Sequence, residues 1–84
     1  MYRLLIKRSA EQDLRRLSRV VFQRVNTKIL TLRDEPRPPG VRKLAAPQEG
    51  WRIRVGDYRI LYQINDSEQT VTIVRVRHRR DAYR

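Results

Sequence analysis

The sequence contains no cysteine, a single histidine, and no apolar run near the roughly 18 residues that a membrane-spanning helix needs. The absence of cysteine excludes disulfides and thiolate metal sites, and it fits a reducing cytoplasm. The lone His78 cannot build a metal site by itself. The first residues, MYRLLIKRSA, lack the apolar segment of a signal peptide. We therefore expect a soluble, cytoplasmic protein with no membrane association, no metal and no cofactor.

Acidic residues are also scarce, since nine Asp and Glu stand against 20 Lys and Arg, for a net charge of +11. Such an excess does not help a compact fold, because like charges repel, and it is expected where the partner is a polyanion. Seventeen of the basic residues are arginine, whose planar guanidinium binds phosphate through paired hydrogen bonds. The composition favours nucleic acid as the partner of one small domain, residues 1–84.

Hydrophobic spacing predicts one strand, two helices and then three strands. The first strand covers residues 2–6, and Ser9 with Gln12 forms a capping-box pattern that predicts a helix start. Helical spacing continues through Val21, Phe22, Val25, Ile29 and Leu32. The segment DEPRPPG, residues 34–40, ends the helical region, because proline lacks the amide hydrogen and clashes with the preceding turn. We expect residues 34–50 to be a connection, with Val41 and Leu44 as anchors.

Three β-rich runs follow at residues 51–55, 58–64 and 70–77. Their turns are Gly56-Asp57 and the polar run NDSEQ at residues 65–69. The order β-α-α-β-β-β predicts an α+β fold, in which both helices pack on one face of a mainly antiparallel, four-stranded sheet.

The stretch WRIRVGDYRILY, residues 51–62, predicts a hairpin that gathers arginines on one face. Gly56-Asp57 is a two-residue loop with glycine first, which is typical of a type II′ turn. Such a turn places Arg54 opposite Arg59, and side-chain alternation puts Arg52 on the same face. Like charges opposite one another destabilise a hairpin by up to ~1 kcal/mol. We interpret the cluster as a phosphate site, and the alternative is an ordinary solvated sheet face.

The final run, RVRHRRDAYR, adds further basic residues. Arg75, Arg77 and Arg79 share a parity, and Val74 and Val76 take the other side. If the strands are neighbours, these arginines extend the hairpin cluster. Tyr83 lies just beyond, where an aromatic ring can stack on a base. A solvated, frayed tail is the alternative reading of this segment.

The chain resembles the RelE family of bacterial and archaeal toxins, within the RelE/ParE superfamily. The resemblance is carried by SAEQDLRRL, by PRPPG with the following RKL, by WRIRVGDYRILYQI and by VRVRHRRDAY. It implies an antiparallel sheet with two N-terminal helices on one face. It also implies a metal-independent endoribonuclease that cuts mRNA in the ribosomal A site and inhibits translation. An acidic, RelB-like antitoxin is the implied partner, in a complex whose oligomeric state the sequence leaves open.

By position in the motif, the resemblance assigns the site to Arg52, Arg54, Arg59, Arg79 and Tyr83. The implied reaction is attack of the ribose 2′-OH on the adjacent phosphate, with guanidinium groups stabilising the developing charge. Well-known relatives carry lysine on the first hairpin strand. Arginine stays protonated there and is a poor proton acceptor. The base is then His78, Tyr83 or a group on the ribosome. Imidazole titrates near neutral pH, but His78 has the opposite parity to Arg77 and Arg79.

Two other functions remain open from the sequence. One is a ParE-like toxin, which shares the fold but poisons DNA gyrase. The other is a non-catalytic module that binds RNA or the ribosome. The hairpin arginines together with Arg79 and Tyr83 favour RNA cleavage, and the codon preference stays undetermined.

Overall fold

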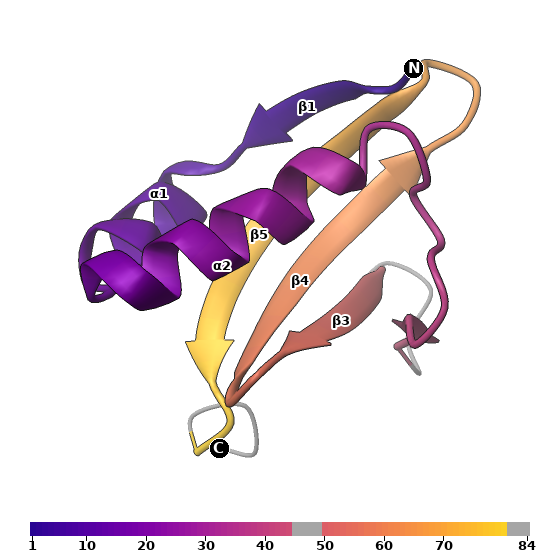
Figure 1. Cartoon of the computed structure of the whole chain (residues 1–84). Helices are drawn as coiled ribbons and strands as arrows, with labels where there is room; N and C mark the ends of the chain where they lie inside the picture. Colours follow the sequence, from indigo (N-terminus) through magenta and orange to yellow (C-terminus); the bar gives the residue numbers. More distant parts are fainter. Residues whose placement is uncertain (45–49, 81–84) are drawn as a thin grey trace.

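The computed structural model describes residues 1–44 and 50–80. The elements are β1 (Arg3–Ile6), α1 (Arg8–Arg15), α2 (Arg19–Thr31), β2 (Arg42–Lys43), β3 (Trp51–Val55), β4 (Tyr58–Asn65) and β5 (Thr70–His78). The strands form one sheet in the order β1-β5-β4-β3-β2, and both helices lie on the same face of it (Figure 1). The predicted α+β class and the placement of the helices are confirmed. In the described part of the chain, no helix is long and apolar enough to cross a membrane.

The sheet has five strands in place of the four predicted, and it is mixed. β1 pairs with β5 in parallel, and the other neighbouring strands are antiparallel. The extra strand is β2, which lies within the connection after α2 and pairs Arg42 with Arg52 and Lys43 with Trp51. The prediction missed it because two charged residues give no hydrophobic alternation. A short, charged edge strand also discourages pairing with other chains.

The predicted capping box at Ser9 and Gln12 is wrong. α1 starts earlier, and its N-cap residue Lys7 makes no side-chain capping hydrogen bond. Ser9 donates its hydroxyl to the carbonyl oxygen of Val74 in β5, at 2.8 Å. Ser9 therefore makes a tertiary contact with β5, whereas the local pattern predicted that it caps the helix.

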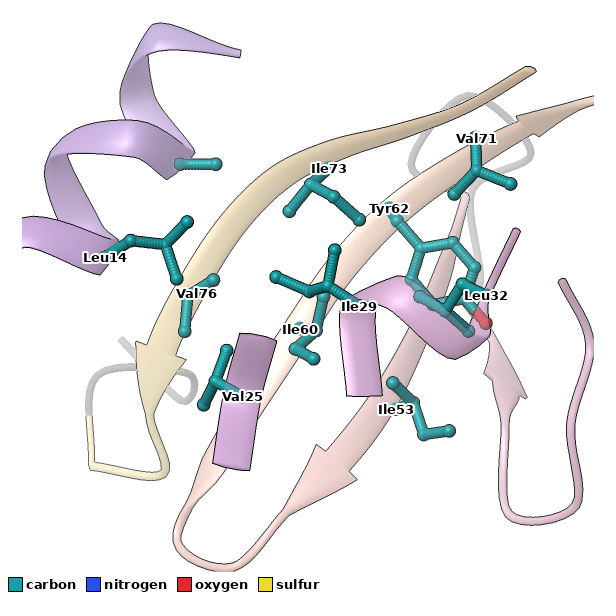
Figure 2. Close-up of a cluster of buried hydrophobic side chains, with 11 residues drawn as sticks. Leu14, Val25, Ile29, Leu32, Ile53, Ile60, Tyr62, Val71, Ile73 and Val76 are labelled. Carbon is teal, nitrogen blue, oxygen red and sulfur yellow. The ribbon is translucent and has the colours of Figure 1, made fainter. Parts of the chain in front are cut away.

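The core lies between α2 and the sheet (Figure 2). Val25 and Ile29 of α2 and its C-cap residue Leu32 are buried and recur four and three residues apart, so the helix and its C-cap present one apolar stripe. The strand residues that complete the core are Ile53, Ile60, Tyr62, Val71, Ile73 and Val76, and α1 contributes Ala10 and Leu14. The hairpin face opposite the arginines therefore belongs to the core, through Ile53, Ile60 and Tyr62.

The proline-rich connection is fastened to the sheet at two consecutive residues. The Tyr62 hydroxyl donates to the Pro36 carbonyl oxygen at 2.8 Å, and burial raises the pKa of Tyr62 to about 12. Arg37 makes two hydrogen bonds to Asp66, at 2.9 and 3.2 Å, and Tyr2 donates to the same carboxylate at 2.6 Å. We call Arg37, Asp66 and Tyr2 the Arg37 clamp. The guanidinium of Arg37 also lies 5.0 Å from the ring centre of Trp51.

Loss of the Arg37 clamp should change how stability depends on pH. The Arg37 guanidinium, and then the Tyr2 hydroxyl, hold the pKa of Asp66 below its ordinary value of 3.8. A carboxyl with a lowered folded-state pKa adds stability above its unfolded pKa, and that stability is lost as the pH falls through the folded value. We expect Asp66→Asn to lower the melting temperature at neutral pH and to flatten its fall on acidification. Circular dichroism melts at a series of pH values measure both.

The matched control is Glu68→Gln, which removes the same charge from the same turn. It should keep the acid-induced fall of the wild type. If Asp66→Asn and wild type fall in parallel on acidification, the clamp does not contribute to stability.

Candidate functional site

The turn at Gly56-Asp57 sets the register of β3 against β4. Gly56 has a φ of +59°, and Asp57, the second residue of the turn, does not have a positive φ. Positive φ at the first central residue alone is the pattern of a type II′ turn. Every pair that this turn predicted is present, including Arg54 opposite Arg59. The predicted register of the hairpin is confirmed.

The next strand extends the line of arginines. Arg77 in β5 lies opposite Arg59 in β4, so Arg54, Arg59 and Arg77 follow one another across three adjacent strands. We call these three residues the arginine row. Paired residues project from the same face of a sheet, and the preceding pairs, such as Ile53 with Ile60, belong to the core. The arginine row therefore projects from the face that the helices do not cover.

Arg77 was not assigned to the site by the sequence, although its parity with Arg75 and Arg79 was visible. Its place opposite Arg59 depends on the register of β4 against β5, which a five-residue turn does not determine. That register also shifts once, between Leu61 and Tyr62. The available signal was therefore the alternation of arginines, without its alignment to the hairpin.

A small hollow lies beside the arginine row. It has a volume of about 70 Å³ and is lined by Gly40, Arg42, Arg52, Arg54 and Arg59. This is little more than twice the ~30 Å³ that one water molecule occupies in the liquid. Arg42 was not predicted, because it reaches the site through the unexpected strand β2. The structure thus brings the three predicted hairpin arginines together and adds a fourth.

The positive charge of this hollow is incompletely neutralised by the described part of the chain. Within residues 1–44 and 50–80, the ion pairs join Arg15 to Glu11, Arg37 to Asp66 and Arg75 to Asp13, and none of these residues lines the hollow. Arg52 and Arg54 have no such pair among these residues. Arg59, at the centre of the row, is only 9% exposed. A ligand with several anionic oxygens suits such a site, because each guanidinium binds through two parallel N–H groups. No three His, Asp or Glu side chains of residues 1–44 and 50–80 gather to hold a metal ion.

Arg79 lies at the turn end of the sheet, outside the small hollow. Its amide donates to the carbonyl oxygen of Asp57 at 2.7 Å. Together with Asp57, His78 and Arg80 it lines a wider hollow of about 680 Å³. Tyr83 lies outside the described residues. The assignment of Arg79 and Tyr83 to the site stays a prediction.

His78 projects from the opposite face of β5 to Arg77. It lies across from Tyr58, and the two rings meet edge to face with centres 5.1 Å apart. Its Nδ1 accepts a hydrogen bond from the Arg80 amide at 3.2 Å, so Nε2 is the nitrogen left for other partners. The parity argument for His78 is confirmed, and its role as a base stays a prediction.

Comparisons with known proteins agree with this fold. Residues 4–83 match the family described as ParE toxin of type II toxin-antitoxin system. The archaeal RelE-RelB complex from Pyrococcus horikoshii OT3 contains a chain that is 28% identical, with a TM-score of 0.82 over 93% of this chain and 94% of that one. The toxin-antitoxin complex RelBE2 from Mycobacterium tuberculosis gives 32% identity and a TM-score of 0.80, over 92% and 96%.

A curated relative matches over a shorter stretch. Toxin RelG of Mycobacterium tuberculosis (strain ATCC 25618 / H37Rv) is 58% identical over 31 residues, which span 37% of this chain and 36% of the relative. The fold, the family match and these relatives define a type II toxin of the RelE/ParE superfamily. The chain belongs to this family and is a RelE-family toxin, as the sequence predicted.

Replacing an arginine of the row should stabilise the fold and weaken ligand binding. Arg54→Thr removes the charge opposite Arg59 and introduces a β-branched residue, so the free energy of unfolding should rise by up to ~1 kcal/mol. Affinity for single-stranded RNA should fall, and the slope of log K against log salt should decrease by about 0.7. Urea denaturation and fluorescence anisotropy measure the two effects.

The control is Arg15→Thr on α1, which removes an exposed arginine paired with Glu11. It should leave RNA affinity unchanged. A less stable Arg54→Thr protein would show that the arginine row carries no electrostatic strain.

Proposed function

We propose that this toxin is a ribosome-dependent, metal-independent endoribonuclease that cuts mRNA in the A site and inhibits translation in the cytoplasm. The observation that supports it is the arginine row beside a small hollow on the face without helices. A phosphodiester is small, anionic and rich in oxygen, so it matches a site lined by several guanidinium groups. The resemblance to RelE toxins supports the same reaction.

The proposed reaction is internal transfer of the phosphodiester. The ribose 2′-oxygen loses its proton and forms a bond to the adjacent phosphorus, and the bond to the 5′ oxygen breaks. The 5′ oxygen takes up a proton, which gives a 2′,3′-cyclic phosphate and a 5′-hydroxyl end. The pentacoordinate state carries an additional negative charge. Guanidinium groups already fixed on paired strands stabilise that charge with little rearrangement.

The proton acceptor in this reaction is a group other than the arginines of the row. Arginine is a poor proton acceptor, so the arginine row binds the phosphate and does not deprotonate the 2′-OH. His78 lies at the C-terminal end of β5 and lines the hollow that also contains Arg79. The proposed acceptors are His78, Tyr83 or a group on the ribosome.

Mapping mRNA 5′ ends in a translating extract tests the proposal. Wild-type protein should produce cuts in phase with the ribosome. Arg54→Ala and Arg77→Ala should each reduce their rate by about 10²-fold, which is the usual cost of losing one group that stabilises transition-state charge. Arg15→Ala is the matched control and should cut like wild type.

Three other results of this experiment would favour a different function or a different site. Gyrase-linked DNA breaks would indicate a ParE-like activity. Ribosome or RNA binding without cuts would indicate a non-catalytic module. Cuts that persist in both arginine variants would separate the nuclease from the arginine row.

We also propose that an acidic, RelB-like antitoxin neutralises this protein. Two of the similar structures are toxin-antitoxin complexes. A groove of about 520 Å³ lies between α2 and the hairpin, lined by Val20, Gln23, Arg24, Thr27, Lys28, Thr31, Arg54, Val55 and Gly56. This lining carries three positive charges and no negative one, and Val20 is 67% exposed. An acidic, amphipathic segment that folds on binding complements it.

Toxin–antitoxin association should weaken as salt rises, because screening reduces attraction between exposed charges. The double variant Arg24→Ala/Lys28→Ala should reduce the salt dependence of Kd. Val20→Ser should weaken binding without changing that dependence, and Leu30→Ser, also on α2 and outside the groove lining, is its control. Titration calorimetry at several salt concentrations measures these effects. Salt-insensitive association would contradict an electrostatic interface.

A further inference from the structure

The C-terminal half of β5 extends beyond the strand that flanks it. β1 pairs with β5 from Thr70 to Ile73, whereas β5 continues to His78 (Figure 1). Backbone groups on an uncovered strand edge have no ladder partner and must be satisfied in another way. Arg77 lies in this half of β5, where β4 holds one edge through pairs such as Arg59 with Arg77. The opposite edge has no neighbouring strand, so other groups must hold it.

Side chains of α1 take that place. The Ser9 hydroxyl donates to the Val74 carbonyl oxygen at 2.8 Å, and Asp13 Oδ2 accepts the Val76 amide at 2.9 Å. Ser9 and Asp13 are four residues apart, so they lie on the same face of the helix. α1 therefore satisfies one acceptor and one donor of β5, on both sides of Arg75.

The backbone of β5 is irregular at the same point. Leu61 lies opposite Arg75 and Tyr62 lies opposite Ile73, which leaves Val74 as an extra residue. A bulge bends its strand and redirects the side chains that follow it. The prediction that Val74 and Val76 project from the same side of the strand is wrong for this reason. The direction of the following residues, including Arg77, is then set by how the bulged strand is held.

Asp13 is itself firmly fixed. Its carboxylate accepts Arg75 Nε at 2.8 Å and Arg75 Nη2 at 3.1 Å, in addition to the Val76 amide. Its side chain is 10% exposed, against 37% for Arg75. Charge-assisted, two-point hydrogen bonds are geometrically restrictive. The carboxylate thus holds the side chain of Arg75 and the amide of Val76, which immediately precede Arg77.

We propose that Asp13 is a positioning residue that holds Arg77 in the arginine row. Asp13 fixes the bulged half of β5, and the fixed backbone keeps Arg77 opposite Arg59 on the neighbouring strand. The inference rests on the proposed function, since it concerns the same phosphate site. Asp13 does not touch the substrate in this scheme and acts only through Arg77.

A double-mutant cycle separates positioning from general stabilisation. Asp13→Asn keeps the size of the side chain and removes its charge. It should reduce mRNA cleavage by about tenfold, within the ~10²-fold that a 1 Å misplacement can cost. In an Arg77→Ala background it should cause no further loss, because the residue it positions is absent. In an Arg52→Ala background it should cause the same tenfold loss as in wild type.

Glu11→Gln is the matched control, because Glu11 lies on the same helix and forms an exposed ion pair with Arg15. It should leave cleavage unchanged. If Asp13→Asn protein is unfolded at the assay temperature, Ser9→Ala tests the same edge of β5 through the milder loss of one hydrogen bond. Thermal denaturation of each variant establishes which of the two is used.

Equal losses in the Arg77→Ala and Arg52→Ala backgrounds would overturn the positioning role and leave the nuclease intact. Absence of ribosome-phased cuts by wild-type protein would overturn the proposed function instead. The same cycle is therefore also measured on affinity for single-stranded RNA. An Asp13→Asn effect on affinity that persists without Arg77 overturns the inference, and an effect that vanishes supports it.

Discussion

The pairing that aligns three arginines on adjacent strands is the constraint on which the candidate site depends. Neighbouring strands lie ~4.8 Å apart, so the backbones that carry Arg54, Arg59 and Arg77 are held side by side. Each opposed pair costs up to ~1 kcal/mol. On the other face, Ile60 is fully buried opposite Ile53, and burial of one such side chain contributes ~1.5–3 kcal/mol. The apolar face therefore outweighs the charged one, and the register that buries the core is the register that aligns the arginines.

Under the proposed function, strand pairing prepares this site for an anion before the anion arrives. Under the proposed function, an oxyanion that enters the hollow meets donors whose backbone is fixed by strand pairing. Such preorganisation is the usual source of large electrostatic effects on a reaction. The acidic residues Asp66 and Asp13 instead bind arginines away from this site. Asp66 binds Arg37 of the proline-rich connection, and Asp13 binds Arg75 of β5. Neither carboxylate lies in the lining of the small hollow.

The parts of this site that the sequence predicted are those determined by local geometry. A two-residue turn leaves one register for β3 against β4, so the position of Arg54 opposite Arg59 followed from Gly56-Asp57 alone. Arg77 did not follow, because the β4–β5 turn is longer and the bulge at Val74 changes the alternation. Nor did Asp13, whose contact with Arg75 joins residues 62 positions apart. The capping box was predicted wrongly because Ser9 bonds to β5 and does not cap its own helix. Strand β2 was missed because its two charged residues show no hydrophobic alternation.

Arg54 is shared by the two regions that the proposed functions of the toxin use. It belongs to the arginine row and lines the small hollow, and it also lines the groove between α2 and the hairpin. Under the proposed function, the positive charge of Arg54 attracts both an acidic segment in that groove and a phosphate in the hollow. Antitoxin binding therefore weakens the positive potential that a phosphate meets at Arg54, even when the two ligands do not overlap in space.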